Sequence, residues 1–192
     1  MKRVSLAITA VLGLMFSLLC SPAHAATIAV PAVPPNVLRA AEDLKTAHPA
    51  LSVSPTLTFN RPGPGGSTRK PSAAADEITC TAQAQYPHQS TGTPSAVDGK
   101  AASFCTAPIA DIRAQAELYR YLDGYGFSLV GIGSLSYALN SAGPVTSYGL
   151  DLCQGRPAYY VLRGIHNYSA PPGYTPPTIT LNTQTPPVLV DC

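Results

Sequence analysis

The clearest alternation of hydrophobic and polar positions runs from Ile78 to Tyr86. Apolar residues or Cys stand at every second position there, and Thr and Gln occupy the positions between them. This period of two predicts a strand with one buried face. The turn-rich stretch 87–99 follows, and residues 100–106 predict a second short strand.

Residues 109–122 carry the signals of both a strand and a helix. Apolar residues alternate from Ile112 to Leu118, as a strand requires, but the Ala, Gln, Glu and Arg between them favour a helix. Asp123-Gly124 is typical of a hairpin turn, and strand-like sequence resumes at Phe127. We therefore predict a strand.

Further strands are predicted at 146–153, 158–165, 178–181 and 188–192, and a Pro-rich loop spans 169–177. The chain holds 20 Pro and 15 Gly, no Trp, and only 11% charged residues, which suits short strands and loops better than a helical bundle. The predicted fold class is all-β, as a small antiparallel sandwich or partly open barrel.

The region 26–76 differs from the rest of the chain. One short helix is predicted over 36–47, with Asn36 as its cap and an apolar face that carries Val37, Leu38, Ala41 and Leu44. A stretch rich in Pro and Gly then follows, from Arg61 to Ser72, and has the composition of a linker. We expect 26–76 to be a mostly irregular segment, a spacer or a removable pro-segment, and the β domain to span 77–192.

The first 25 residues have the three parts of a secretory signal peptide. Lys2 and Arg3 precede an apolar run over 4–19, and Ala23-His24-Ala25 predicts cleavage after Ala25. The run is short for a membrane anchor, which needs roughly 20 residues. A lipoprotein signal with Cys20 is the other alternative, but the bulky Leu19 precedes that cysteine. We expect a secreted protein with no stable membrane insertion after cleavage.

The charge of the mature chain is near zero. Lys2 and Arg3 leave with the signal, so the 12 basic residues become 10, against 10 acidic residues. A partner such as nucleic acid or an anionic membrane surface calls for a basic patch, and the sequence contains no such cluster.

Four cysteines remain after the signal: Cys80, Cys105, Cys153 and Cys192. An even number in an exported chain indicates two disulfides. Three pairings are open, and we favour Cys80–Cys105 with Cys153–Cys192 because each would join neighbouring strands. The spacing lacks CxxC and a nearby His pair, so zinc is disfavoured, and no motif predicts a cofactor.

The order of short motifs in 77–192 resembles a group of small secreted actinobacterial proteins with no assigned activity. The motifs are Cys80, Tyr86-Pro87-His88-x-Ser90, Cys105, Leu118-Tyr119-Arg120, Cys153, Pro171-Pro172-Gly173-Tyr174 and a final Cys. The resemblance implies a two-disulfide all-β domain, and it implies no catalytic or binding residues.

Catalytic chemistry has weak candidates. His48, His88 and His166 remain after processing, but no GxSxG frames a serine, and the cysteines are expected to be oxidised. Glu117 and Asp151 are the candidate acid pair of a glycoside hydrolase, although nothing in the sequence brings them together. We expect both to be solvent-facing strand charges, and His88 to be exposed in a turn.

All ten Tyr residues lie in the predicted domain. Tyr combines a large apolar ring with a polar tip, which suits a binding surface, and we name Tyr119, Tyr121, Tyr159 and Tyr174 as its candidates. The alternative is that Tyr supplies core volume in a domain without Trp.

The first functional hypothesis is a secreted, non-catalytic domain that binds an extracellular protein or an envelope component. The second is an inhibitor of a secreted enzyme such as a protease, acting through a loop such as 87–99 or 169–177. The third is a hydrolase with an unrecognised site, which would need His88 or His166 beside a carboxylate in a concave pocket.

Overall fold

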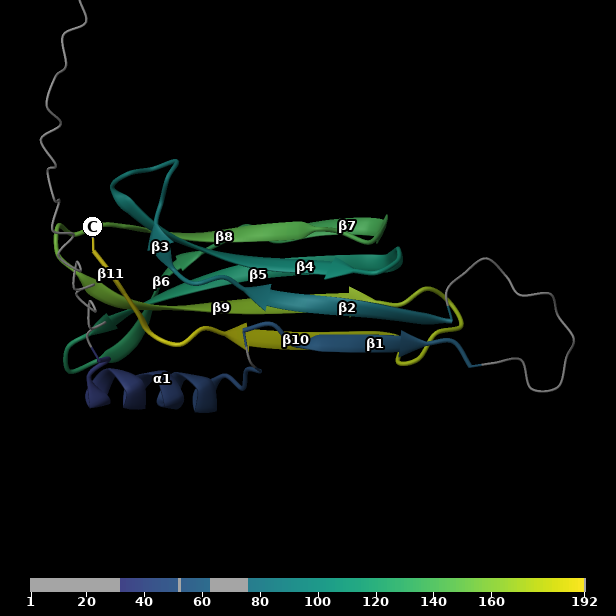
Figure 1. The fold of residues 1–192 in the computed structure, drawn as a ribbon, viewed down its shortest axis with the longest axis horizontal. Helices are drawn as coiled ribbons and strands as arrows, with labels where there is room; N and C mark the ends of the chain where they lie inside the picture. The colour runs from purple at the N-terminus through teal and green to yellow at the C-terminus, as the bar shows by residue number, and fades with distance from the viewer. Residues whose placement is uncertain (1–31, 52, 63–75, 192) are drawn as a thin grey trace, which may run out of the picture. The chain divides into compact units, whose positions relative to one another are not determined.

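The computed structural model describes residues 32–51, 53–62 and 76–191 (Figure 1). The predicted signal peptide and most of the predicted linker lie outside the described residues. One helix and eleven strands are described: α1 (Pro35–Ala47), β1 (Thr56–Asn60), β2 (Glu77–Ala84), β3 (His88–Gln89), β4 (Ala96–Cys105), β5 (Ile109–Leu122), β6 (Gly126–Ile132), β7 (Ser136–Ser141), β8 (Val145–Leu152), β9 (Ala158–Ser169), β10 (Thr178–Gln184) and β11 (Val188–Val190).

The strands form two sheets in which every described pairing is antiparallel. One sheet has the order β1-β2-β4-β3, with β8 also paired to β4. The other has the order β10-β9-β5-β6, with β11 also on β9 and β7 also on β5. The antiparallel all-β class is therefore confirmed, and the sheets do not close into a barrel.

The main core lies between the two sheets. Phe59 and Ile78 of the first sheet pack in one cluster with Ile112 and Tyr168 of the second, and a second cluster joins the sheets further along. The Tyr168 hydroxyl also crosses between the sheets and donates to the Thr81 carbonyl, 2.8 Å away. Burial raises the pKa of Tyr168 to about 12, so this contact keeps its proton at any physiological pH.

The strand prediction for 109–122 is confirmed, with the same bounds as β5. This strand pairs with β6, β7 and β9, which makes it the centre of its sheet. The expected hairpin turn follows it, where Gly124 takes a φ of 78° that a residue with a side chain rarely adopts. β1, β3 and β7 were not predicted.

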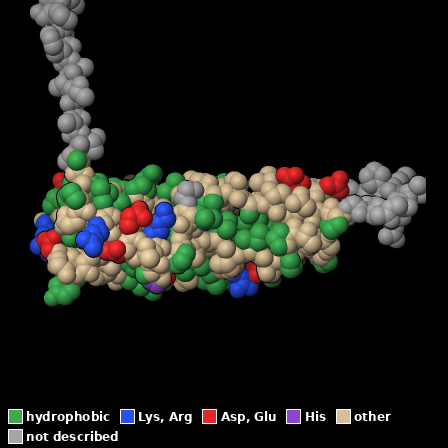
Figure 2. Space-filling view, turned by 90° about the horizontal axis from the view of Figure 1, so that it is seen from below, with side chains coloured by type: hydrophobic (Ala, Val, Ile, Leu, Met, Phe, Trp, Pro, Cys, Tyr) green, Lys and Arg blue, Asp and Glu red, His purple; other side chains and the backbone are tan. Residues whose placement is uncertain are grey.

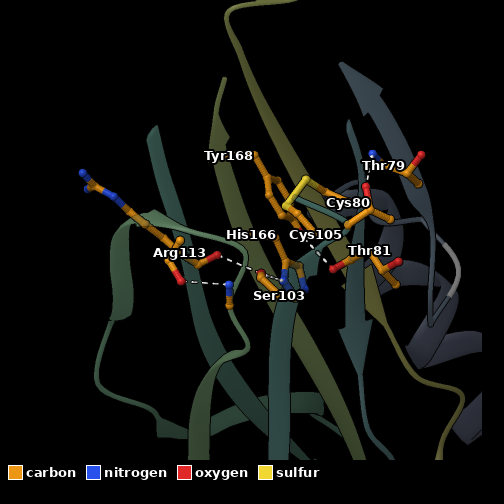
Figure 3. Close-up of a disulfide and its surroundings, with 11 residues drawn as sticks. Thr79, Cys80, Thr81, Ser103, Cys105, Arg113, His166 and Tyr168 are labelled. Atoms are coloured by element: carbon orange, nitrogen blue, oxygen red, sulfur yellow. Dashed lines mark hydrogen bonds between the residues drawn. A yellow bond between two sulfur atoms is a disulfide. The ribbon is translucent and has the colours of Figure 1, made fainter. Parts of the chain in front are cut away.

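The predicted Cys80–Cys105 disulfide is confirmed. Cys80 of β2 lies directly opposite Cys105 of β4 in the sheet register, so the bridge joins neighbouring strands as expected. Figure 3 shows this disulfide beside the ring of Tyr168. Cys192 lies outside the described residues, so its pairing with Cys153 stays a prediction.

The predicted helix is confirmed as α1, but its cap and its apolar face differ from the prediction. Pro34 is the N-cap, and Asn36 lies inside the helix. The buried residues are Val37, Ala41 and Leu44, and the last two pack on Tyr119, Val161 and Phe127 of the sheet. Leu38 is 47% exposed. Each residue of a helix is rotated by about 100° from the one before it, which takes Leu38 off the face that carries Val37.

The described residues before Glu77 pack with the strands that follow them. β1 pairs with β2 over five residues, and α1 packs on the second sheet. The described residues within 32–191 belong to one compact unit, so the boundary placed at Asp76 separates elements that pack together. On the face seen in Figure 2, the charged side chains gather mainly at one end of the molecule.

Candidate functional site

An open cleft of about 670 Å³ lies at one end of the two sheets. Four stretches that are far apart in the sequence form its walls: the start of α1, the β5–β6 hairpin, the β8–β9 loop with the start of β9, and β11. Its aromatic lining consists of Tyr121, Tyr125, Tyr159 and Tyr160. We call it the tyrosine cleft.

A fixed polar network forms the floor of the tyrosine cleft. Arg120 Nη1 donates to Asp151 Oδ2 at 2.8 Å, and the Tyr160 hydroxyl donates to the same oxygen at 3.1 Å. Burial is the main cause that raises the pKa of Tyr160, and the charge of Asp151 adds to it. The Tyr160 ring is 2% exposed, so this residue supports the floor and offers little surface to a ligand.

The rim of the cleft presents both rings and hydrogen-bonding groups. Tyr125 is 86% exposed at the tip of the β5–β6 hairpin, and Tyr121 and Tyr159 are half-buried. The Asn36 amide donates to the Tyr121 hydroxyl at 2.8 Å, which fixes this ring to the helix. Three further exposed polar residues also line the cleft: Asp123, Gln154 and Arg156.

The four predicted surface tyrosines divide into two pairs. Tyr121 and Tyr159 line the cleft. Tyr119 is 7% exposed beneath α1, and Tyr174 is 5% exposed beside Arg61, so the prediction of a surface position is wrong for these two. Both serve as core volume, which was the alternative for Tyr. Sequence reasoning missed Tyr125, although its place in a Gly-Tyr-Gly hairpin turn favours exposure.

His166 forms a hydrogen-bonded pair with Ser103 at a distance typical of a nucleophile and its base. Ser103 Oγ is 2.9 Å from His166 Nδ1 (Figure 3), and Thr183 Oγ1 is 3.0 Å from Nε2. However, His166 and Ser103 are both 0% exposed between the sheets. The Ser103 hydroxyl donates to the Arg113 carbonyl, so Nδ1–H donates to Ser103 and Thr183 donates to Nε2. This arrangement is a core polar network and no substrate reaches it.

Burial lowers the pKa of His166 from 6.5 to about 4. As the pH falls, His166 is therefore protonated in the unfolded chain before it is protonated in the folded chain. Above about pH 6.5 both states hold the neutral ring and the contribution of this group to stability is fully present, and it is lost as the pH falls towards 4. We expect the free energy of unfolding to fall by about 2 kcal/mol between pH 7 and pH 5 from this group alone. Urea unfolding at both pH values measures it.

The His166→Gln variant tests the origin of this pH dependence. Its loss of stability between pH 7 and pH 5 should be smaller than that of the wild type by the amount attributed to His166. His48→Gln is the matched control, because the His48 side chain is exposed. An unchanged pH dependence in His166→Gln would show that other groups cause it.

The other candidate catalytic groups lie apart. His88 pairs with Asp98 at 2.9 Å on the first sheet, and neither residue lines the tyrosine cleft. Glu117 and Asp151 are bound in different ion pairs, with Arg163 and with Arg120. The expectation that both carboxylates face solvent is wrong: their side chains are 18% and 14% exposed.

The two loops considered for an inhibitor differ in exposure. The 169–177 loop buries Tyr174 and is hydrogen-bonded through Thr175 to Asn60, whereas residues 91–95 are exposed.

In the described part of the chain, no three His, Cys, Asp or Glu side chains gather where they could hold a metal ion. Nor is any helix in the described ranges both long and apolar enough for a membrane span.

Comparison with protein-family models, with curated proteins and with solved structures gives no match to this chain.

Proposed function

We propose that this protein is a secreted, non-catalytic binding domain that takes a neutral glycan of the envelope or extracellular space in its tyrosine cleft. The observation that carries the proposal is the combination of aromatic rings with hydrogen-bonding side chains around one open cleft. Export is proposed from the signal-like residues 1–25, and the Cys80–Cys105 disulfide is compatible with it.

The rings suit the apolar faces of sugars. Tyr supplies a broad, rigid surface at low cost in conformational entropy, with a hydroxyl at its tip. The Asn36 hydrogen bond holds the Tyr121 ring in place before a ligand arrives, and the hairpin turn between Gly124 and Gly126 presents Tyr125 to solvent. Asp123, Gln154 and Arg156 supply donors and acceptors for hydroxyl groups.

The charge balance favours a neutral ligand. Arg120 is compensated by Asp151, and Arg156 and Asp123 have opposite charges on the same rim. Binding of phosphate or nucleic acid needs an excess of positive charge at the site, and the paired charges of this cleft do not provide one. The open shape suits a segment of a chain better than a small molecule that must be enclosed.

The carboxylates of the cleft support binding without cleavage. Asp151 accepts hydrogen bonds from both Arg120 and Tyr160, and Asp123 is exposed on a turn. A glycosidase needs one carboxyl group kept protonated and a second one across the bond to be cleaved. Asp151 already accepts from Arg120 and Tyr160 through one oxygen, and it is not among the residues that line the cleft, so it is not placed to give a proton to a glycosidic oxygen there.

The test is calorimetric titration of the protein with neutral tetrasaccharides built from glucose, xylose or N-acetylglucosamine. We expect at least one to bind, and Tyr125→Ala and Tyr159→Ala each to weaken binding about tenfold, which corresponds to ~1.4 kcal/mol. Tyr86→Ala is the matched control, because Tyr86 is 52% exposed and lies outside the cleft.

Two results would overturn the proposal. One is binding that is lost in Tyr86→Ala but kept in both cleft variants. The other is the absence of binding to every glycan together with binding of a decaproline peptide in the cleft, because aromatic-lined grooves also receive proline-rich segments.

A further inference from the structure

The floor of the tyrosine cleft lies where two neighbouring strands part. The pairing of β5 with β9 ends at Arg120, which is opposite Tyr160. Beyond this pair, β5 continues beside β6, and β9 begins beside β11. Residues from both diverging ends line the cleft. Arg120 therefore stands at the closed end of the opening, with its side chain 13% exposed.

Arg120 has hydrogen-bond donors left for a ligand. A guanidinium group carries N–H donors and no acceptor. Arg120 donates to Asp151 through Nη1, and Nε and Nη2 make no hydrogen bond to the described part of the chain. Neither of these two nitrogens is among the buried atoms that lack a partner. They are therefore open to the cleft that Arg120 lines.

Two apolar side chains stand next to these donors. Arg120 and Tyr160 are directly opposite in the register and share a face of the sheet. Side chains alternate between the faces of a strand, so Leu122 is on the same face of β5 as Arg120. By the same rule, Ala158 shares a face of β9 with Tyr160. Leu122 and Ala158 both line the cleft, so its floor places N–H donors beside a small apolar surface.

On the basis of the glycan binding proposed above, we infer that the tyrosine cleft selects N-acetylated sugars and that Arg120 determines this specificity. An acetamido group has a carbonyl oxygen, which accepts hydrogen bonds without a hydrogen of its own, and a methyl group. The carbonyl oxygen suits the N–H donors of Arg120, and the methyl group suits Leu122 and Ala158. A glucose hydroxyl in the same place has no methyl group, and its own hydrogen needs a further acceptor.

The charges at the floor favour a neutral carbonyl over a carboxylate. Asp151 Oδ2 lies 2.8 Å from Arg120 Nη1 and compensates the charge of the guanidinium. Arginine forms strong hydrogen bonds with carboxylates, but the carboxylate of a ligand would bring a second negative charge close to Asp151. Like charges at such short range repel each other, and a neutral acceptor avoids this cost.

The test is calorimetric titration with two tetrasaccharides of the same linkage, one built from glucose and the other from N-acetylglucosamine. They differ only in the group on the second carbon of each ring. We expect the N-acetylated glycan to bind about tenfold more tightly, because glucose lacks both the carbonyl oxygen and the methyl group. In Arg120→Met, the two dissociation constants should agree to within about threefold.

Two further variants separate recognition from a structural effect. Arg120→Met combined with Asp151→Asn removes the donors without leaving a carboxylate unpaired, and it should lose the preference in the same way. Arg156→Met is the matched control, because Arg156 carries the same charge on the exposed rim of the cleft. It should change both dissociation constants by the same factor. Circular dichroism verifies that each variant is folded.

The outcomes distinguish this inference from the proposed function. Binding of the glucose tetrasaccharide in the cleft as tightly as the N-acetylated one overturns the inference and leaves the proposed function standing. Binding of no neutral glycan overturns both. A preference that survives in both Arg120 variants shows that another residue determines it. Tighter binding of a galacturonic acid tetrasaccharide than of the N-acetylated glycan would assign Arg120 to a carboxylate instead.

Discussion

Arg163→Met should lower the free energy of unfolding by about 3–5 kcal/mol, which is the usual cost of removing one partner from a buried ion pair. The Arg163 side chain is 4% exposed, and its Nη1 lies 2.7 Å from Glu117 Oε2. The variant leaves the Glu117 carboxylate, whose side chain is 18% exposed, without its counter-charge. Urea unfolding monitored by circular dichroism measures the loss.

A second substitution separates this explanation from a general packing effect. In Arg163→Met with Glu117→Leu, no buried charge is left alone, so a large part of the lost stability should return. Arg113→Met is the control, because the Arg113–Asp111 pair lies on the surface and its removal should change stability little. A double variant as unstable as Arg163→Met would contradict the explanation.

Arg163 also joins the helix to the sheet. Its Nη2 donates to the His48 carbonyl, just after the last residue of α1, at 3.4 Å, and the guanidinium lies 5.9 Å from the centre of the Tyr119 ring. Burial is the main cause that raises the pKa of Tyr119. Because the start of α1 lines the tyrosine cleft, loss of this contact should also weaken glycan binding.

Replacing Cys80 and Cys105 together by Ala should lower the free energy of unfolding by about 3–4 kcal/mol. The two residues are 25 positions apart, and the chain-entropy model gives this magnitude for a loop of that length. Cys80 is 0% exposed in the main core, so lost packing adds to the effect. Guanidinium unfolding of the variant and of the wild type, without reductant, measures the difference.

Reductant provides the control for this prediction. Dithiothreitol should destabilise the wild type at least as much as the double replacement does, since it opens the same bridge. A variant as stable as the oxidised wild type would show that the Cys80–Cys105 bridge contributes little beyond the pairing of β2 with β4.

The sequence predicted the elements whose patterns are local. The alternation from Ile112 to Leu118, followed by Asp123-Gly124, was enough to choose a strand over a helix at β5. β1 has the same alternation, with Leu57 and Phe59 buried, but it is short and precedes a linker-like stretch, so it was assigned to an irregular segment. β7 carries too few apolar residues at buried positions for its pattern to stand out.

The site could be predicted only in part. Tyr121 and Tyr159 were named because Tyr is common at binding surfaces, and the same reasoning named Tyr119 and Tyr174, which are buried. The difference depends on where α1 and the 169–177 loop pack, and these are long-range contacts. The ion pairs of Glu117 and Asp151 were missed for the same reason: their partners lie 46 and 31 positions away in the sequence.

The most direct test of the proposed function is to map a bound tetrasaccharide onto the protein by ¹⁵N NMR, using whichever of the three neutral glycans binds most tightly in calorimetry. We predict that the amide shifts concentrate at the β5–β6 hairpin, the β8–β9 loop and the first turn of α1, which together line the tyrosine cleft. Shifts concentrated elsewhere on the protein, or none at a saturating glycan concentration, would contradict the account.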